Sequence, residues 1–249
     1  HGNAQFAPGI ADEKSAIQVS HHLLLSHGLA MSAMRAVGAS AELGIVLNQW
    51  TADAATDSEA DRAMAELEYA RSVQWFMDPI FKGHYPELAM RAHGENAPVI
   101  HADDMDVIHQ PIDFLGVNYY FRAWCSAANP PLPAPALQGV TDMGWEIYPQ
   151  GLTELLMALQ AEYILPPIYI TENGMASADQ LVDGKIPDTN RINYINVHLE
   201  ALSQAIDAGV DVRGYFLWSL LDNFEWNSGY AKRFGIVHVD YATQTRRLK

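Results

Sequence analysis

The residues best placed to do chemistry lie in the tetrapeptide Thr171-Glu172-Asn173-Gly174. Glu172 follows the apolar run Ile168-Tyr169-Ile170, so its carboxylate would lie at the end of a buried strand and be poorly solvated on one side. A carboxylate in that position can act as a nucleophile. The tetrapeptide is short, however, and a glutamate that only caps the following loop fits it equally well.

A second segment, Trp218–Trp226, combines two tryptophans with Asp222, Asn223 and Glu225. An indole ring can stack on the apolar face of a sugar, and a carboxylate can accept hydrogen bonds from two neighbouring hydroxyls. Core packing of the tryptophans is the alternative. The interleaved polar residues argue against it, because polar groups are costly to bury. The segment therefore indicates a carbohydrate-binding surface.

A third group, Asn118-Tyr119-Tyr120, offers an amide and two phenols. A tyrosine hydroxyl beside a nucleophilic carboxylate can donate a hydrogen bond to it and hold its orientation. Taken alone, the group fits a half-buried strand end better than a site.

The elements that must position these residues alternate between helix and strand. Helices are predicted near residues 12–37, 57–76, 151–162 and 191–208, and strands near 44–48, 113–120, 168–173 and 212–219. This order predicts an α/β fold with a parallel sheet. Polar or aromatic residues gather at the carboxyl ends of the strands. This favours a (β/α)8 barrel over a doubly wound sheet, because those ends converge on one pocket in a barrel.

Composition narrows the partners. The 249 residues include 30 acidic and 15 basic ones, a formal charge of −15, which disfavours nucleic acid as a partner. No apolar run is long enough for a membrane span, so no membrane partner is expected. The single cysteine, Cys125, is expected to be inert in a loop, and its being alone fits a cytoplasmic protein. The ten histidines show no ligand spacing, so neither a metal nor a cofactor is expected.

Together the motifs resemble family 1 glycoside hydrolases, the β-glucosidase family of (β/α)8 barrels, over essentially all 249 residues. The resemblance rests on six segments in order: 44–48, 116–120, 143–149, 170–174, 214–226 and 233–236. So many ordered matches leave an unrelated α/β domain as a remote alternative.

The resemblance implies a role for each site residue. Glu172 would be the nucleophile of a retaining β-glycosidase, and Tyr120 would donate a hydrogen bond to it. The sugar-binding residues would be Asn118, Trp218, Glu225, Trp226 and Phe234, with Trp145 as a wall of the aglycone site and Phe6 and Asn48 beside it. Family members that act on 6-phosphosugars typically carry a serine where Glu225 stands. The resemblance therefore favours unphosphorylated glucosides, fucosides or galactosides, including short β-linked oligosaccharides.

One family motif, the Thr-x-Asn-Glu-Pro that carries the acid/base glutamate, is absent. His1–Gly9 resembles the loop just downstream of it, so residues 1–249 are expected to be the C-terminal half of a single TIM-barrel domain, strands five to eight, without the final helix that would begin near Arg246. Such a half-barrel is expected to have little activity alone and to bind the N-terminal half or a second copy of itself. A catalytically silent carbohydrate-binding or scaffold protein, and a thioglucosidase-like enzyme, remain as alternatives.

Overall fold

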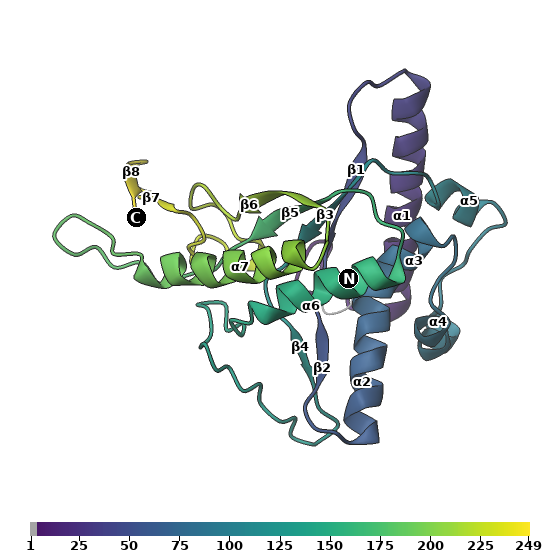
Figure 1. The fold of residues 1–249 in the computed structure, drawn as a ribbon, viewed down its shortest axis with the longest axis horizontal. Helices are drawn as coiled ribbons and strands as arrows, with labels where there is room; N and C mark the ends of the chain where they lie inside the picture. Colours follow the sequence, from purple (N-terminus) through teal and green to yellow (C-terminus); the bar gives the residue numbers. More distant parts are fainter. Residues whose placement is uncertain (1–3) are drawn as a thin grey trace.

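The computed structural model describes residues 4–249; residues 1–3 of the predicted loop 1–9 lie outside the described part. A four-stranded sheet forms the centre, in the order β1-β3-β5-β6 (Figure 1). These strands are β1 (Gly44–Asn48), β3 (Phe114–Asn118), β5 (Ile168–Asn173) and β6 (Val212–Leu217). All neighbouring strands are parallel, which confirms the predicted α/β organisation. The strands at 44–48 and 168–173 begin and end where the sequence predicts.

Four long helices also lie where the sequence predicts them: α1 (Glu13–Ala36), α2 (Glu59–Tyr69), α6 (Gln150–Glu162) and α7 (Thr189–Asp207). Ser58 caps α2 by accepting a hydrogen bond from the backbone N–H of Asp61. The helical path does not stop near residue 76, however. It continues through a π-helical turn, η1 (Ala70–Gln74), into α3 (Trp75–Phe81). Burial of Trp75, Met77 and Ile80 in the core explains the extension.

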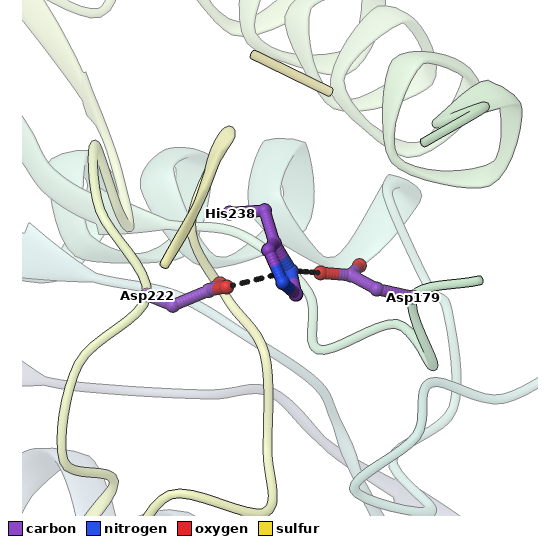
Figure 2. A group of neighbouring side chains, drawn as sticks. All are labelled: Asp179, Asp222 and His238. Atoms are coloured by element: carbon purple, nitrogen blue, oxygen red, sulfur yellow. Dashed lines mark hydrogen bonds and ion pairs between the residues drawn. The ribbon is translucent and has the colours of Figure 1, made fainter. Parts of the chain in front are cut away.

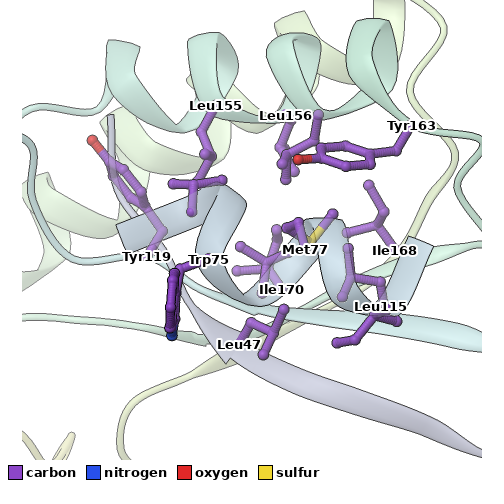
Figure 3. Packing of buried hydrophobic residues seen from close by; sticks show 14 of the residues in the cluster. Leu47, Trp75, Met77, Leu115, Tyr119, Leu155, Leu156, Tyr163, Ile168 and Ile170 are labelled. Atoms are coloured by element: carbon purple, nitrogen blue, oxygen red, sulfur yellow. The ribbon is translucent and has the colours of Figure 1, made fainter. Parts of the chain in front are cut away.

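One face of the sheet packs against helices. Leu155 and Leu156 of α6 lie over Ile168 and Ile170 of β5, with Met77 of α3 between them (Figure 3). All five are buried. Figure 1 shows α6 and α7 side by side along this face. Removal of this apolar surface from water is the main term that stabilises the chain.

The opposite face of the sheet is open. Successive side chains of a strand point to opposite faces, so Leu47 is buried while Val46 is 47% exposed. Phe216 of β6 is 57% exposed on the same open face. A hollow of about 380 Å³ lies there, lined by Glu42, Val46, Phe114, Tyr169, Thr171 and Phe216. The outer edges of β1 and β6 are the two edges of the sheet.

The remaining elements are short. β2 (Ala52–Ala54) pairs with β4 (Ala123–Cys125) in parallel, and β7 (Val237–Val239) pairs with β8 (Arg246–Leu248) in antiparallel fashion. The other short elements are α4 (Glu87–His93), η2 (Gly94–Asn96), α5 (Asp104–Ile108) and η3 (Trp226–Ser228).

The prediction that Cys125 lies in a loop is wrong, because it is buried at the end of strand β4. Residues Arg246–Leu248 form strand β8. Within the described part of the chain, no helix is both long and apolar enough to cross a membrane.

Candidate active site

The carboxyl ends of β3, β5 and β6 bring three of the predicted residues together. Asn118 pairs with Glu172 in the sheet register, and a register shift between Val117 and Asn118 accompanies this pairing. The backbone N–H of Trp218 donates to the carbonyl of Asn173 at 3.0 Å, which continues the ladder beyond β6. Adjacent strand ends therefore place an amide, a carboxylate and an indole next to one another.

Gly174 makes this close arrangement of strands possible. A Cβ atom at this position would lie 1.8 Å from the carbonyl oxygen of Trp218, well inside van der Waals contact. Only glycine lets the backbone just after Glu172 approach the backbone at Trp218 so closely. This explains the last residue of the Thr171–Gly174 motif.

Glu172 is held by a tyrosine. The hydroxyl of Tyr120 donates to Oε2 of Glu172 at 2.6 Å. Burial raises the pKa of Tyr120 well above its ordinary value, and the hydrogen bond to Glu172 raises it further. The phenol therefore remains a protonated donor at neutral pH and fixes one oxygen of the carboxylate.

A second carboxyl group, Glu225, belongs to the same site. It is 8% exposed. Burial raises its pKa, a hydrogen bond from Trp218 opposes the shift, and the negative charge of Glu172 raises the pKa further. Glu225 and Glu172 thus influence each other electrostatically, and Trp218 is bound to Glu225.

Asn118 is oriented by a neighbour on β5. The hydroxyl of Thr171 donates to Oδ1 of Asn118 at 2.7 Å. With its carbonyl oxygen accepting this bond, the side chain presents its NH₂ group as the donor toward a ligand. Thr171 was not singled out from the sequence as a site residue, although it precedes Glu172 in the motif.

Three aromatic rings, those of Tyr120, Trp145 and Phe234, pack together beside Glu172. Tyr120 lies 5.4 Å from Trp145 and 6.2 Å from Phe234, and Trp145 lies 6.2 Å from Phe234 (centroid distances). Phe234 is only 1% exposed, so it supports the other two rings from behind. Trp226 is set apart from this group: it is 71% exposed and packs edge-on against Phe6 at 6.1 Å.

Beside the site lies an ion-pair cluster that the sequence did not reveal. Nδ1 of His238 lies 2.9 Å from Asp179 and 3.5 Å from Asp222 (Figure 2). Nζ of Lys249 lies 2.7 Å from Asp179 and 2.9 Å from Asp222. Arg233 adds a further cation at 2.9 Å from Asp222.

Within residues 4–249, Asp179, Asp222 and His238 form the one group with the spacing of metal ligands. The Lys249 ammonium already contacts both carboxylates, so the group is neutralised by cations of the chain itself. Burial opposes ionisation of Asp222, but Lys249 and Arg233 outweigh it and hold its pKa below the ordinary value. Asp222 also accepts the N–H of Gly235 at 3.0 Å. The cluster therefore fixes the segment that carries Phe234.

Comparison with known proteins gives one family. Residues 1–249 match glycosyl hydrolase family 1. Beta-glucosidase A of Acetivibrio thermocellus is 43% identical over 253 aligned residues, which cover 98% of this chain and 56% of that protein. The chain thus spans little more than half the length of this relative.

Solved structures agree. The beta-glucosidase of Exiguobacterium antarcticum superposes with a TM-score of 0.93 at 44% identity, over 100% of this chain and 58% of that one. The virulence factor SghA of Agrobacterium tumefaciens, solved with its substrate analog salicin, superposes with a TM-score of 0.94 at 38% identity, over 100% of this chain and 57% of that one.

Proposed function

The chain belongs to glycosyl hydrolase family 1, and we propose that it carries the nucleophile, Glu172, and the sugar-binding side of a retaining β-glucosidase. Its match to solved family members over its whole length implies the TIM-barrel fold. The observation that carries the proposal is the 2.6 Å hydrogen bond from Tyr120 to Glu172 at the carboxyl end of β5. Active sites of this fold lie at that end of the barrel.

The chemistry follows from a carboxylate held in this way. Oε1 of Glu172 attacks the anomeric carbon, the bond from that carbon to the aglycone oxygen breaks, and a general acid protonates the departing oxygen. Water then replaces Glu172, with the former acid acting as base. Retaining enzymes hold the two carboxyl groups about 5–5.5 Å apart. The Tyr120 hydroxyl leaves Glu172 the other oxygen for attack.

The remaining site residues fit a sugar without a phosphate. The Asn118 amide can donate to one hydroxyl, Glu225 can accept from two, and Trp218 and Trp145 offer apolar rings. Glu225 would repel a phosphate by its charge. The salicin complex of a relative supports β-glucosides as the substrate class, and short β-linked oligosaccharides carry the same terminal sugar.

The general acid comes from elsewhere in this proposal. Glu225 is assigned to sugar binding, and Glu146 is paired with an arginine. We take the chain to be strands five to eight of the barrel. The open face with Val46 and Phe216, and a hollow of about 520 Å³ beside β1, would then receive the N-terminal half that supplies the acid. A second copy of this chain is the other candidate for that surface, because open sheet edges promote association.

Two other functions compete. A thioglucosidase-like member would have Glu172 but no acid/base glutamate opposite it. A catalytically silent carbohydrate-binding or scaffold protein would keep the sugar-binding rings, and Glu172 would not react. The two differ from each other, and from the β-glucosidase, in whether Glu172 forms a bond to the sugar and whether an acid is needed.

Covalent trapping tests the proposal. A 2-deoxy-2-fluoro-β-glucoside with a dinitrophenolate leaving group needs no general acid, because the leaving group departs as a stable anion. Incubation followed by peptide mass spectrometry is expected to show the fluorosugar on Glu172. Glu172→Gln should remove the label, and Glu200→Gln on the exposed side of α7 should retain it. A wild-type chain that binds glucose but takes up no label would favour the silent binding protein.

A further inference from the structure

A buried arginine, Arg122, lies two residues after Tyr120 and has no part in the roles assigned above. Its side chain is 9% exposed. It connects β2, the β3–β4 region and the segment that carries Trp145. Buried arginines require partners, because an unpaired charge is costly to remove from water.

The guanidinium makes contacts on every side. Nε and Nη2 donate to the two carboxylate oxygens of Glu146 at 2.8 and 3.0 Å, a bidentate pair. Nη1 donates to Asp53 of β2 at 2.7 Å. The planar group also lies 3.7 Å from the centroid of the Tyr148 ring and 4.6 Å from that of Trp124. A lysine could not reproduce this planar, forked arrangement.

Glu146 links Arg122 to Trp145, whose ring packs against those of Tyr120 and Phe234. It directly follows Trp145 in the chain, and its Oε1 accepts the backbone N–H of Ala136 at 2.9 Å. The carbonyl of Trp145 accepts the N–H of Thr141 at 2.8 Å, and Glu146 forms a β-bridge with Val140. The loop between Ala136 and Glu146 is therefore closed by the same carboxylate that Arg122 holds.

We propose that Arg122 is a positioning residue that holds Trp145 against Tyr120 through its bidentate pair with Glu146. The inference rests on the proposed function in one respect, which is that Trp145 lines the substrate site. Arg122 touches no substrate in this account. It sets where the indole of Trp145 stands beside the ring that orients Glu172.

Loss of Arg122 would leave the Glu146 carboxylate buried and without its counter-ion. Removal of one partner of a buried pair is strongly unfavourable, so Glu146 would turn toward water. The hydrogen bond from Ala136 would be lost with it, and the loop 136–146 would open. Trp145 would then lose its fixed position relative to Tyr120 and Phe121, whose ring centroids lie 5.4 Å from it.

The test observes Trp145 directly. The chain has six tryptophans and can be labelled uniformly with 5-fluorotryptophan. Single Trp→Phe variants assign the ¹⁹F resonances of Trp145, Trp75 in the core and Trp218. The spectra to compare are those of the wild type, Arg122→Met, Arg122→Lys and Glu146→Gln. Arg213→Met is the matched control, because Arg213 makes the same bidentate pair with Asp211 at the exposed end of β6.

We expect Arg122→Met and Glu146→Gln to shift or broaden the Trp145 resonance while Trp75 and Trp218 stay unchanged. Arg122→Lys should restore it only in part, and Arg213→Met should have no effect. An unchanged Trp145 resonance in Arg122→Met overturns the proposal. So does a loss of the Trp75 resonance in Arg122→Met, Arg122→Lys and Glu146→Gln alike. Arg122 would then support the whole fold and not the position of Trp145 alone.

A titration separates this inference from the proposed function. An aryl 1-thio-β-glucoside, followed through the Trp145 resonance, should bind the Arg122→Met chain about three- to tenfold more weakly than wild type, the range expected for one lost aromatic contact. Affinity for glucose should be unchanged. If neither ligand binds any form of the chain, the proposed function fails. In that case, a Trp145 resonance that changes in Arg122→Met but not in Arg213→Met would still support the positioning role of Arg122.

Discussion

The two faces of the sheet differ in how completely this chain covers their apolar side chains. On the covered face, Val117 and Ile170 are fully buried against helices that lie in the same 249 residues. On the open face, Val46 and Phe216 remain about half exposed over a hollow. The first face is a finished core. The second is apolar yet uncovered, which fits a chain that spans 56% of a relative's length.

The predicted site residues Asn118, Glu172 and Trp218 lie at the carboxyl ends of the strands. The side of the site near β6 is anchored by buried ion pairs around Asp222, whereas the outer strand β1 borders a hollow of about 520 Å³. Glu172 on β5 therefore lies between the Tyr120 hydrogen bond from the β3 side and the buried ion pairs near β6. Variants can break or sharpen this contrast.

The largest effect is expected at the anchored side. Asp222→Asn removes the carboxylate that Lys249 and Arg233 share, and breaking a buried ion pair costs about 3–5 kcal/mol. Asp211→Asn is the control, because its pair with Arg213 is exposed and screened by water and should contribute little to stability. Urea unfolding of both variants gives the comparison. Equal losses of stability would contradict the assignment of Asp222 as an anchor.

A pH effect is expected next, from the covered side. Burial lowers the pKa of His198 on α7 to about 4 from 6.5. The unfolded chain therefore takes up a proton at a higher pH than the folded chain does. Stability should fall as the pH drops from 6.5 toward 4, by up to about 3 kcal/mol from this group. His198→Phe keeps a ring beside Tyr194 and should flatten the plot of unfolding free energy against pH between 6.5 and 4. An unaltered plot would show that His198 is not the group responsible.

A matched pair of valines compares the two faces directly. Val117→Ala in β3 empties part of the covered core and should cost about 2 kcal/mol in denaturant unfolding. Val46→Ala in the neighbouring strand β1 changes an exposed side chain and should stay within about 0.5 kcal/mol. If both cost the same, the open face is covered in solution by a second copy of this chain, which light scattering would detect.

A last effect, on reaction rate instead of stability, concerns the hydrogen bond that Glu172 accepts from Tyr120. Tyr120→Phe keeps the ring that packs against Trp145 and Phe234, and it removes the hydroxyl that donates to Glu172. A hydrogen bond to a charged group is worth about 1.5–3 kcal/mol, so trapping by the activated fluoroglucoside should slow about tenfold or more. Tyr119→Phe is a control, because its hydroxyl donates to the backbone of Tyr148. Equal rates for wild type and Tyr120→Phe would remove Tyr120 from the site.

Much of the fold could be predicted because its strands are short, apolar and bounded by polar residues. Gly44–Asn48 and Ile168–Asn173 are correct to the residue for that reason. The continuation into α3 was missed because Pro79 lies inside that helix, where it is normally unfavourable. Ala52–Ala54 was missed as a strand because alanine and aspartate have little β-propensity.

The site was predicted where chemistry follows from neighbours in sequence. Glu172, Tyr120 and Glu225 come from short motifs, and the structure groups them. Arg122 and Glu146 are 24 positions apart, and Asp222 and Lys249 are 27 apart, so only the fold reveals those pairs. The sequence could not show the setting of Trp226: it belongs to a predicted motif, and the turn after Glu225 leaves its ring exposed, so its sugar-binding role stays a prediction.

The most direct test adds the partner that we propose, an N-terminal half of the barrel. Hydrolysis of 4-nitrophenyl β-D-glucoside is measured for this chain alone, and again after mixing with the portion of Acetivibrio thermocellus beta-glucosidase A that the chain does not match. A general acid is worth about 10²–10⁴-fold in rate. We predict a gain of that order, lost in Glu172→Gln. Full turnover by the chain alone, or a stable complex without any gain, would contradict the account.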